Sequence, residues 1–474
     1  MAINISQDDY NVLKQAYIEK WLKLEVLNFS YNVVDEISGN MVSCSVSVDS
    51  ESDIRRTCSV GLVVTDSSFD IQAGGKVWLD KLIRPYVGYL NIRTGDIQWY
   101  NQGVYLINEP SYQYDATTNT LSFTGVDLMS KLTGMRNGNL EGLTHIIPQG
   151  SNVRESMIAT LALAGFNKYI INECANTDGA IQAVPYDIEV EQGGTVYDIL
   201  AKLRDILPQY QIYFDVNGVF HYEPIPDGAD APVLIDDDLW GNVLISETVN
   251  TDFESVKNVV EVYGGSHDVT YYSTETAVSG GAISLTIANL TEAAAYTLIG
   301  FTLPSAVSEA ATISINSGTA VELVNSNGAQ ITALAADTYY VASMGADGKW
   351  LFMGGYQPHA VAKDENPDSP FYIGNDMGEI RIVLYGGDYD NITSDELAQQ
   401  RADLEIYWRC RLNDNISLTS IPIPWVDVNI VISHATKGGT EQARYIIKSY
   451  TADYGESNSM TITAITFYPY YPSY

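Results

Sequence analysis

The chain has 474 residues, of which 46% are hydrophobic and 18% charged, a balance typical of globular rather than disordered proteins. Its 25 lysines and arginines stand against 59 aspartates and glutamates, and the net charge of −34 excludes a protein that holds nucleic acid by electrostatic attraction. This length predicts roughly three or four domains, and the 33 tyrosines and 37 glycines favour a mainly β fold.

The acidic charge has two interpretations that composition cannot separate. It either keeps a solvated surface soluble or lines a passage through which DNA slides without sticking. Four cysteines without a CxxC pair do not make a disulfide framework, so we expect reduced, buried thiols and assembly in a cytoplasm. The amino terminus lacks a signal-peptide core, and no run reaches the ~18–20 apolar residues that span a bilayer, so we expect a soluble protein.

Residues 1–139 are predicted to form an amino-terminal helix and a first β domain. Ser6 and Asp9 have capping-box spacing, and the apolar residues that follow predict a helix over about 8–20. From Leu24 the hydrophobic period changes to two, with strands predicted at 42–48, 58–65 and 102–107. Residues 115–119 are predicted to be a hairpin loop.

Residues 140–245 are predicted to form a small α+β domain. Ser151 is expected to cap a helix that ends at Gly165. Thr195 and Asp198 form a second capping box, ahead of an apolar stripe that Pro208 ends. The pair Asn217-Gly218 between two alternating runs is a strong β-hairpin signal.

Residues 246–278 plus 357–474 are predicted to form a second β domain that is interrupted by an inserted module at 279–356. This nearly neutral, alanine-rich block carries a single basic residue, Lys349. Strands at 285–287, 312–315 and 339–342 predict a small all-β module, added where insertions are tolerated. A helix capped by Thr393 and strands at 417–423, 426–433, 444–452 and 459–467 complete the second domain.

No motif in the chain predicts catalysis or a cofactor. There is no nucleophile elbow, P-loop, HExxH or dinucleotide-binding glycine motif. The run 236–238, three aspartates, is either a solvated turn or a calcium site without the usual spacing. His145 and His221 are expected to be hydrogen-bonded, partly buried side chains. We therefore predict no catalytic residue, no metal, no cofactor and no enzymatic activity.

Three stretches in order resemble the baseplate hub family of phage tails, which includes the amino-terminal region of tail-associated proteins. They are residues 103–111 with 119–127, residues 194–200 with 213–222, and residues 366–371 with the later helix and 421–429. The third resembles the second barrel of hubs in phages and prophages of Gram-positive bacteria. The inserted module is similar to small β modules of tail fibres and tail tips.

The resemblance implies a structural protein of the virion tail tip. The expected fold is mainly β with α+β: two tube-like β-barrel domains, a small α+β domain between them, and the inserted module. A homotrimer would present six similar barrels to a six-fold tail tube and a three-fold face to a spike or tip protein, around an acidic channel for DNA. The implied partners are the tube, the distal tail protein, the spike and the tape measure protein, with no specific nucleic-acid binding.

Two alternatives remain open for function. The inserted module could bind a host-surface glycan through Tyr339, Tyr340, Trp350 and Tyr356, or these rings could be the core of the module. A wall hydrolase would, by the resemblance, need a carboxy-terminal extension that this chain does not show. The tyrosine-rich end, 467–474, is either packed at an interface or frayed.

Overall fold

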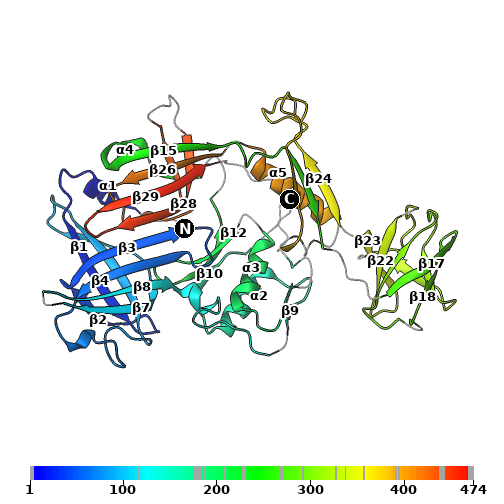
Figure 1. Cartoon of the computed structure of the whole chain (residues 1–474), viewed down its shortest axis with the longest axis horizontal. Coiled ribbons are helices and arrows are strands. Elements are labelled where there is room, and N and C mark those ends of the chain that lie inside the picture. Colours follow the sequence, from blue (N-terminus) through cyan, green and yellow to red (C-terminus); the bar gives the residue numbers. More distant parts are fainter. Residues whose placement is uncertain are drawn as a thin grey trace. The chain divides into compact units, whose positions relative to one another are not determined.

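The computed structural model describes residues 5–115, 117–142, 144–173, 183–184, 188–207, 210–226, 231–265, 271–290, 293–325, 328–336, 338–355, 358–387, 389, 392, 395–411, 413–436 and 443–467. The chain divides into two compact units. Unit 1 is Met1–Asp252 with Asn413–Ser473, and unit 2 is Phe253–Leu412 with Tyr474. Both units are mainly β, which confirms the expected fold class (Figure 1). None of the helices within the described ranges has the length and apolar character needed to cross a bilayer.

Unit 1 is built on a 14-stranded sheet. Its main path runs in order through β15 (Leu244–Asp252), β26 (Asn413–Ser420), β29 (Ser459–Thr466), β28 (Ala443–Asp453), β3 (Met41–Asp49), β4 (Arg56–Val63), β8 (Asn119–Asp127), β7 (Tyr105–Tyr114), β5 (Leu82–Leu90), β1 (Lys20–Leu27) and β2 (Val33–Ser38). Off this path, β6 (Ile97–Asn101) pairs with β5, and β27 (Val431–His434) pairs with β28 and with β14 (Val233–Ile235).

The sheet contains strands from both the amino-terminal and the carboxy-terminal parts of the chain. In Figure 1, β28 from the carboxy-terminal part lies beside β3 from the amino-terminal part. These two strands are antiparallel, with Ser449 opposite Asp49 and Asp453 opposite Ser45. The eight strands from β15 to β7 are therefore one continuous antiparallel stretch, made of two blocks of four that meet at β3 and β28.

Most strands of this stretch have one buried face and one exposed face, because apolar and polar residues alternate along their sequences. On β4, Cys58, Val60 and Leu62 are buried, and Thr57 and Ser59, which alternate with them, are exposed. Side chains of successive residues point to opposite faces of a sheet, so the apolar set forms one wall of the core. The core includes side chains from both blocks, among them Val46, Val60, Ile447 and Ile462.

A small α+β region of unit 1 lies around the helices α2 (Val153–Leu163) and α3 (Val196–Asp205). It has the sheets β10–β13–β12 (Tyr169–Ile171, Phe220–Pro224, Tyr210–Phe214) and β11–β9 (Ile188–Val190, His145–Ile147). Thr195 and Asp198 form the expected capping box, and Gly218, at φ +74°, turns the expected hairpin. The cap of α2 is Asn152 rather than Ser151, because the Asn152 side chain accepts from the Glu155 amide.

The described residues of unit 1 also form four short helices, each of which begins after a capping residue. The expected capping box of Ser6 and Asp9 starts α1 (Gln7–Leu13), which is shorter than predicted because strand pairing begins at Lys20. Asp236 caps α4 (Asp237–Val243), so the three aspartates are a helix start and not the predicted turn. Two single-turn helices, η1 (Ser67–Phe69) and η2 (Leu128–Lys131), each follow a capping aspartate.

One predicted strand is wrong in its first half. The apolar run 426–433 is a buried loop up to Ile430, and pairing starts only at Val431. Pro422 and Pro424 lack amide protons for a ladder, and Asn429 has a positive φ of 56°. The run is apolar because it is buried, not because it is extended.

Unit 2 contains a three-stranded sheet covered by a helix. The sheet has the order β24 (His359–Lys363), β16 (Val259–Tyr263), β25 (Arg381–Leu384), and α5 (Asp395–Arg409) packs on it through Ala398 and Ala402. The side chain of Asn258 donates to the carbonyls of Phe371 and Gly378, and these bonds fix the segment before β25. Thr393, the predicted cap of α5, lies outside the described residues.

Unit 2 also contains the inserted module, which is a closed barrel. Its strands follow the order β17 (Tyr271–Ser279), β18 (Ala282–Ile287), β20 (Thr312–Ile315), β21 (Val321–Val324), β23 (Trp350–Gly355), β22 (Tyr339–Met344), β19 (Leu298–Thr302). The barrel begins at Tyr271, before the predicted boundary at 279, because β17 pairs with both β18 and β19.

The residues expected to form one second barrel are divided between the units. Residues 246–252 and 413–473 belong to unit 1, where β28 pairs with the amino-terminal strand β3. Residues 253–278 and 357–412 belong to unit 2. The physical reason is that β15 and β26 pair only with each other and with β29, whereas β16 pairs with β24 and β25.

Candidate functional site

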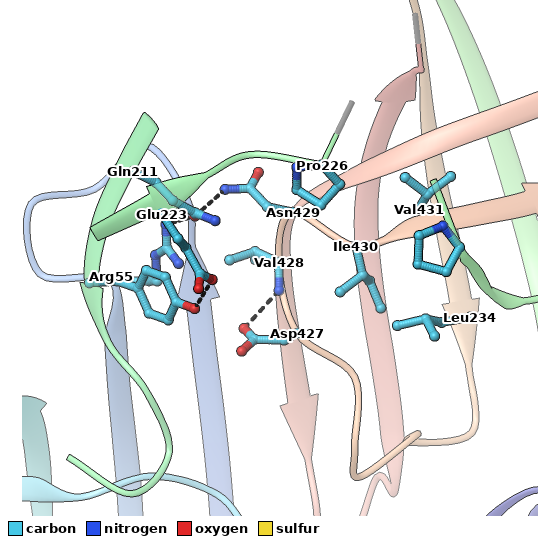
Figure 2. Close-up of a pocket in the computed structure, with 12 residues that line it drawn as sticks. Arg55, Gln211, Glu223, Pro226, Leu234, Asp427, Val428, Asn429, Ile430 and Val431 are labelled. Carbon is cyan, nitrogen blue, oxygen red and sulfur yellow. Dashed lines mark hydrogen bonds between the residues drawn. The ribbon is translucent and has the colours of Figure 1, made fainter. Parts of the chain in front are cut away.

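Three segments of unit 1 bring polar side chains into one buried cluster (Figure 2). Arg55 and Arg56 stand at the start of β4, the hairpin β12–β13 contributes Gln211 and Glu223, and the buried loop before β27 contributes Asp427. Both arginines are buried, at 5% and 2% exposure. Charged groups are this deeply buried only when partners satisfy them.

Gln211 connects the first arginine to the buried loop. Its Oε1 accepts hydrogen bonds from Arg55 Nη2 and from Asn429 Nδ2, each at 2.7 Å (Figure 2). The Arg55 guanidinium also lies over the Tyr213 ring, 4.2 Å from its centroid. Burial lowers the pKa of Arg55 to about 10, and Asp427 opposes this effect, so the group is charged at neutral pH.

Arg56 and Asp427 form a buried ion pair between Arg56 Nη2 and Asp427 Oδ2. The Arg56 amide donates to Asp127 at 3.0 Å, and Asp127 also accepts from the Met129 amide at 2.9 Å. Burial raises the pKa of Asp127 to about 6, although these two bonds and the arginines lower it. The ion pair connects the amino-terminal block directly to the loop of the carboxy-terminal block.

His221 lies between two carboxylates. Its Nε2 is 3.4 Å from Asp215 Oδ2 and its Nδ1 is 3.4 Å from Glu223 Oε2, and Tyr213 donates to Glu223 Oε1 at 2.5 Å. Burial alone would lower the pKa of His221, but the bonds and charges of the two carboxylates outweigh it and raise the pKa to about 9. Burial would raise the pKa of Glu223, but bonds from His221 and Tyr213 lower it to about 2.

A small pocket of about 40 Å³ opens beside this cluster, lined also by Pro226, Pro232, Leu234 and Val431. A space of this size holds a few water molecules, whereas pockets for small-molecule ligands measure ~300–1,000 Å³. His221 is protonated at pH 7 and so cannot act as a general base there. The arrangement therefore fits a structural network that fixes three segments together.

The structure places the predicted glycan-stacking residues of the inserted barrel in different surroundings. Trp350 and Tyr340 are 1% and 6% exposed and belong to the core of the barrel. Tyr339 is half-buried on the outside, and its ring stacks on that of Tyr272, with the centroids 6.5 Å apart. Tyr356 lies outside the described residues. The predicted four residues therefore do not share one surface.

The other residues singled out in the sequence are histidines and cysteines. His221, expected to be hydrogen-bonded and partly buried, is 4% exposed and lies between two carboxylates that were not predicted, and His145 is a half-buried residue of β9. Cys44 and Cys58 are buried free thiols and Cys410 is half-buried, while Cys174 lies outside the described residues. Among the described residues, no group of three or more His, Cys, Asp or Glu could hold a metal ion.

Sequence reasoning missed Arg55, Arg56 and Asp427. The available signal was an adjacent pair of arginines directly before an apolar strand in a chain with only 25 basic residues. Asp427 gave no signal, because its partner Arg56 is 371 residues away.

Comparisons with known proteins agree on the fold. Residues 368–471 match a family model described as a domain of unknown function (DUF5048), and no curated protein sequence matches. The 43 kDa tail protein of prophage MuSo2 from Shewanella oneidensis is similar with a TM-score of 0.51 and 11% identity, covering 94% of this chain and 98% of that one. The tail protein from Neisseria meningitidis MC58 is similar with a TM-score of 0.50 and 9% identity, covering 94% and 96%. Over nearly its whole length, the chain has the fold of these two tail proteins.

Proposed function

We propose that this protein is a structural component of a phage tail tip, a baseplate hub that forms a trimeric ring. The observation that carries the proposal is the pair of antiparallel blocks in unit 1, β15-β26-β29-β28 and β3-β4-β8-β7, joined edge to edge. The shared fold of the two tail proteins supports a place in the tail. Membership of the hub family of Gram-positive phages stays a prediction.

Symmetry connects this architecture to the role. Each chain carries two four-stranded blocks, so three chains carry six. A ring of six similar blocks can contact a six-fold tube on one side, while its true three-fold symmetry suits a spike or tip protein on the other. The distal tail and tape measure proteins would be further partners in the virion, and the ring needs no enzymatic activity.

Within the part of the chain that the structure describes, no further strand pairs with the outer side of β15 or with the outer side of the later half of β7. Among the described strands, β15 pairs with β26 alone. At the other end, β7 pairs with β5 only at Tyr105 and Leu106, so its later half pairs with β8 alone. The edge of a sheet is a place where a strand of another chain can add to the sheet. Pairing of β15 with the later half of β7 from the next copy would close the sheet into a ring.

Exposed apolar side chains on these edges support an interface there. Tyr112 and Tyr114 on β7 are 50% and 71% exposed, and Ile245 on β15 is 62% exposed. Tyrosine is enriched in protein interfaces, and an exposed apolar sheet edge promotes aggregation unless a partner covers it. The net charge of −34 is compatible with a central channel through which DNA passes without electrostatic attraction.

The test is the mass of the assembly in solution. Three chains of 52.1 kDa are expected in light scattering or mass photometry, alone or with the tube protein. Tyr112→Lys combined with Ile245→Lys should abolish the trimer, because a charge directed into a strand–strand contact opposes pairing.

The matched control is Val34→Lys on β2, a 51% exposed residue on an edge that the ring does not use. This variant should form trimers like the native chain. A native protein that remains monomeric with and without tube protein would contradict the hub, and loss of the trimer in the control would contradict the choice of edges.

A second candidate function, binding of a host-surface glycan by the inserted barrel, rests on the stacked rings of Tyr272, which is exposed, and Tyr339, which is half-buried. Tyr272 is 56% exposed and its ring stacks on Tyr339 at an interplanar angle of 29°. Tyr272→Ala should reduce adsorption of particles to host cells while Tyr296→Ala, at a 77% exposed ring elsewhere on the barrel, should not. Equal adsorption of both variants and the native particle would exclude this role for the pair.

A further inference from the structure

The solvent side of the eight-stranded stretch carries a continuous row of hydroxyl groups. Cross-strand partners follow one another from β15 to β4 without interruption, through six strands. The row consists of Ser246, Thr419, Thr461, Thr451, Ser47 and Thr57. Ser47 Oγ and Thr451 Oγ1 are 3.0 Å apart across the joint between the two blocks.

The rows on both sides of this one also consist of serine and threonine residues. We call the three rows together the hydroxyl face. One flanking row runs through Thr248, Ser417, Thr463 and Ser449, and the other through Ser45, Ser59 and Thr124. These residues are exposed or half-buried. On β3, β4 and β29 their neighbours along the strand are mostly buried in the core, whereas β15, the edge strand, is exposed or half-buried along its whole length.

Charge is confined to the margins of the hydroxyl face. Its rows contain two charged residues, Asp49 and Asp453, each near a strand end. Asp49 accepts from the Glu51 amide at 2.9 Å, and Asp453 accepts from the Gly455 amide at 2.7 Å, so both carboxylates are engaged in turns. In a chain with 59 acidic residues, the paired positions in the middle of these rows are all uncharged.

We propose that the hydroxyl face is the wall of the channel and that duplex DNA passes along it. This inference rests on the proposed ring. The opposite side of the sheet packs against the core of unit 1, so a sheet closed by edge pairing must have this bulk outside and the hydroxyl face toward the axis.

An uncharged hydroxyl face is suited to the passage of DNA, which is a polyanion. A basic wall would release counterions and hold DNA, and an acidic wall would repel it. Hydroxyl groups donate and accept hydrogen bonds with water and so do neither. The proposed wall is thus neutral rather than acidic, which differs from the expectation drawn from the net charge. A docking face for a protein would instead be enriched in aromatic side chains, and these rows contain none.

The test adds positive charge to the wall and asks which DNA can reach it. The wall variant combines Ser47→Lys, Ser122→Lys and Thr463→Lys, at three exposed and well-separated positions on β3, β8 and β29. The control combines Ser284→Lys, Thr286→Lys and Thr302→Lys, at exposed positions of the inserted barrel. The probes are a short linear duplex and a covalently closed circular plasmid, because only the linear duplex can thread a ring.

We expect the native ring to bind neither probe. The wall variant should bind the linear duplex at least tenfold more tightly than the plasmid per site, and its affinity should fall on the order of 10³-fold between 50 and 200 mM salt if about six lysines contact phosphate. The control variant should treat the two probes alike.

Three results would overturn the inference. A trimeric wall variant that binds plasmid and linear duplex equally places the face outside the ring, while the proposed ring itself stands. A trimeric wall variant that no longer recruits the tube or tip protein makes the face a protein-docking surface. A protein that forms no trimer removes the proposed function and the channel together.

A second measurement tests the same inference in case the wall variant does not fold. Ser47→Cys is a small change at an exposed position, and the buried thiols Cys44 and Cys58 provide an internal background. In the trimer, the new thiol should react with a small maleimide but not with one coupled to a large bead. Reaction with both would place the face on the outside.

Discussion

Removal of Arg56 should destabilise unit 1 far more than removal of any exposed arginine. Arg56→Met keeps most of the aliphatic stem, so packing changes little, but it leaves the Asp427 carboxylate without its cation. The two side chains are 2% and 12% exposed, so water cannot replace the lost partner. Breaking a buried pair in this way costs ~3–5 kcal/mol.

We expect the loss in free energy of unfolding for Arg56→Met to lie near the lower end of that range. Asp427 keeps one hydrogen bond from the Val428 amide at 2.8 Å, and the charge of Arg55 remains close by. We therefore expect about 3 kcal/mol for Arg56→Met. The double variant Arg56→Met with Asp427→Leu should cost at least ~2 kcal/mol less than the sum of the single variants, because it leaves no unpaired buried charge.

The assay is urea unfolding followed by hydrogen exchange on peptides of β4 and β28, which report on unit 1 separately from unit 2. Arg93→Met is the matched control, since Arg93 pairs with Asp8 at 71% and 48% exposure and such pairs contribute under ~1 kcal/mol. A cost for Arg56→Met within ~0.5 kcal/mol of the control would refute the view that the pair fixes the two blocks together.

Three further predictions concern local features. The pKa of His221 is about 9 in the fold against 6.5 for the free group, so its protonation stabilises the fold fully below about pH 6.5 and this contribution is lost as pH rises through 9. Urea titrations should show native stability falling relative to His221→Gln over that window by on the order of 2 kcal/mol, with solvent screening allowed for; an unchanged difference would contradict the assignment. Thr195→Ala removes the capping box of α3 and should cost about 1 kcal/mol in the same titration, with no loss meaning that the cap is dispensable. Trp350→Ala should cost ~3–5 kcal/mol and abolish exchange protection of the inserted barrel while β3 and β4 keep theirs; protection retained in the barrel would show that Trp350 is not central to its core.

Features encoded within a few residues could be predicted from the sequence. The capping boxes at Ser6 and Thr195 and the turn at Asn217-Gly218 form where expected, because each depends on contacts between residues at most three positions apart or on one backbone conformation. The alternation of buried and exposed residues likewise predicted the strands around β3, β4 and β29.

Features that depend on distant pairing could not be predicted. Nothing in 41–49 or 443–453 indicates that β3 and β28 are neighbours, and the assignment of 246–278 with 357–474 to a single domain followed chain order instead. The hydroxyl face was hidden for the same reason: serines and threonines between apolar residues mark the exposed side of any strand, and only the register reveals that Ser47 and Thr451 are adjacent. The ion pair of Arg56 and Asp427 likewise forms only after the sheet has closed.

The most direct test of the account is a cryo-electron microscopy map of the purified full-length protein assembled with tube protein. We expect a closed three-fold ring in which β15 of each copy lies beside the later half of β7 of the next, with Ser47 and Thr461 facing the axis. A monomer on the tube, or a ring whose axis is lined by other surfaces, would contradict it.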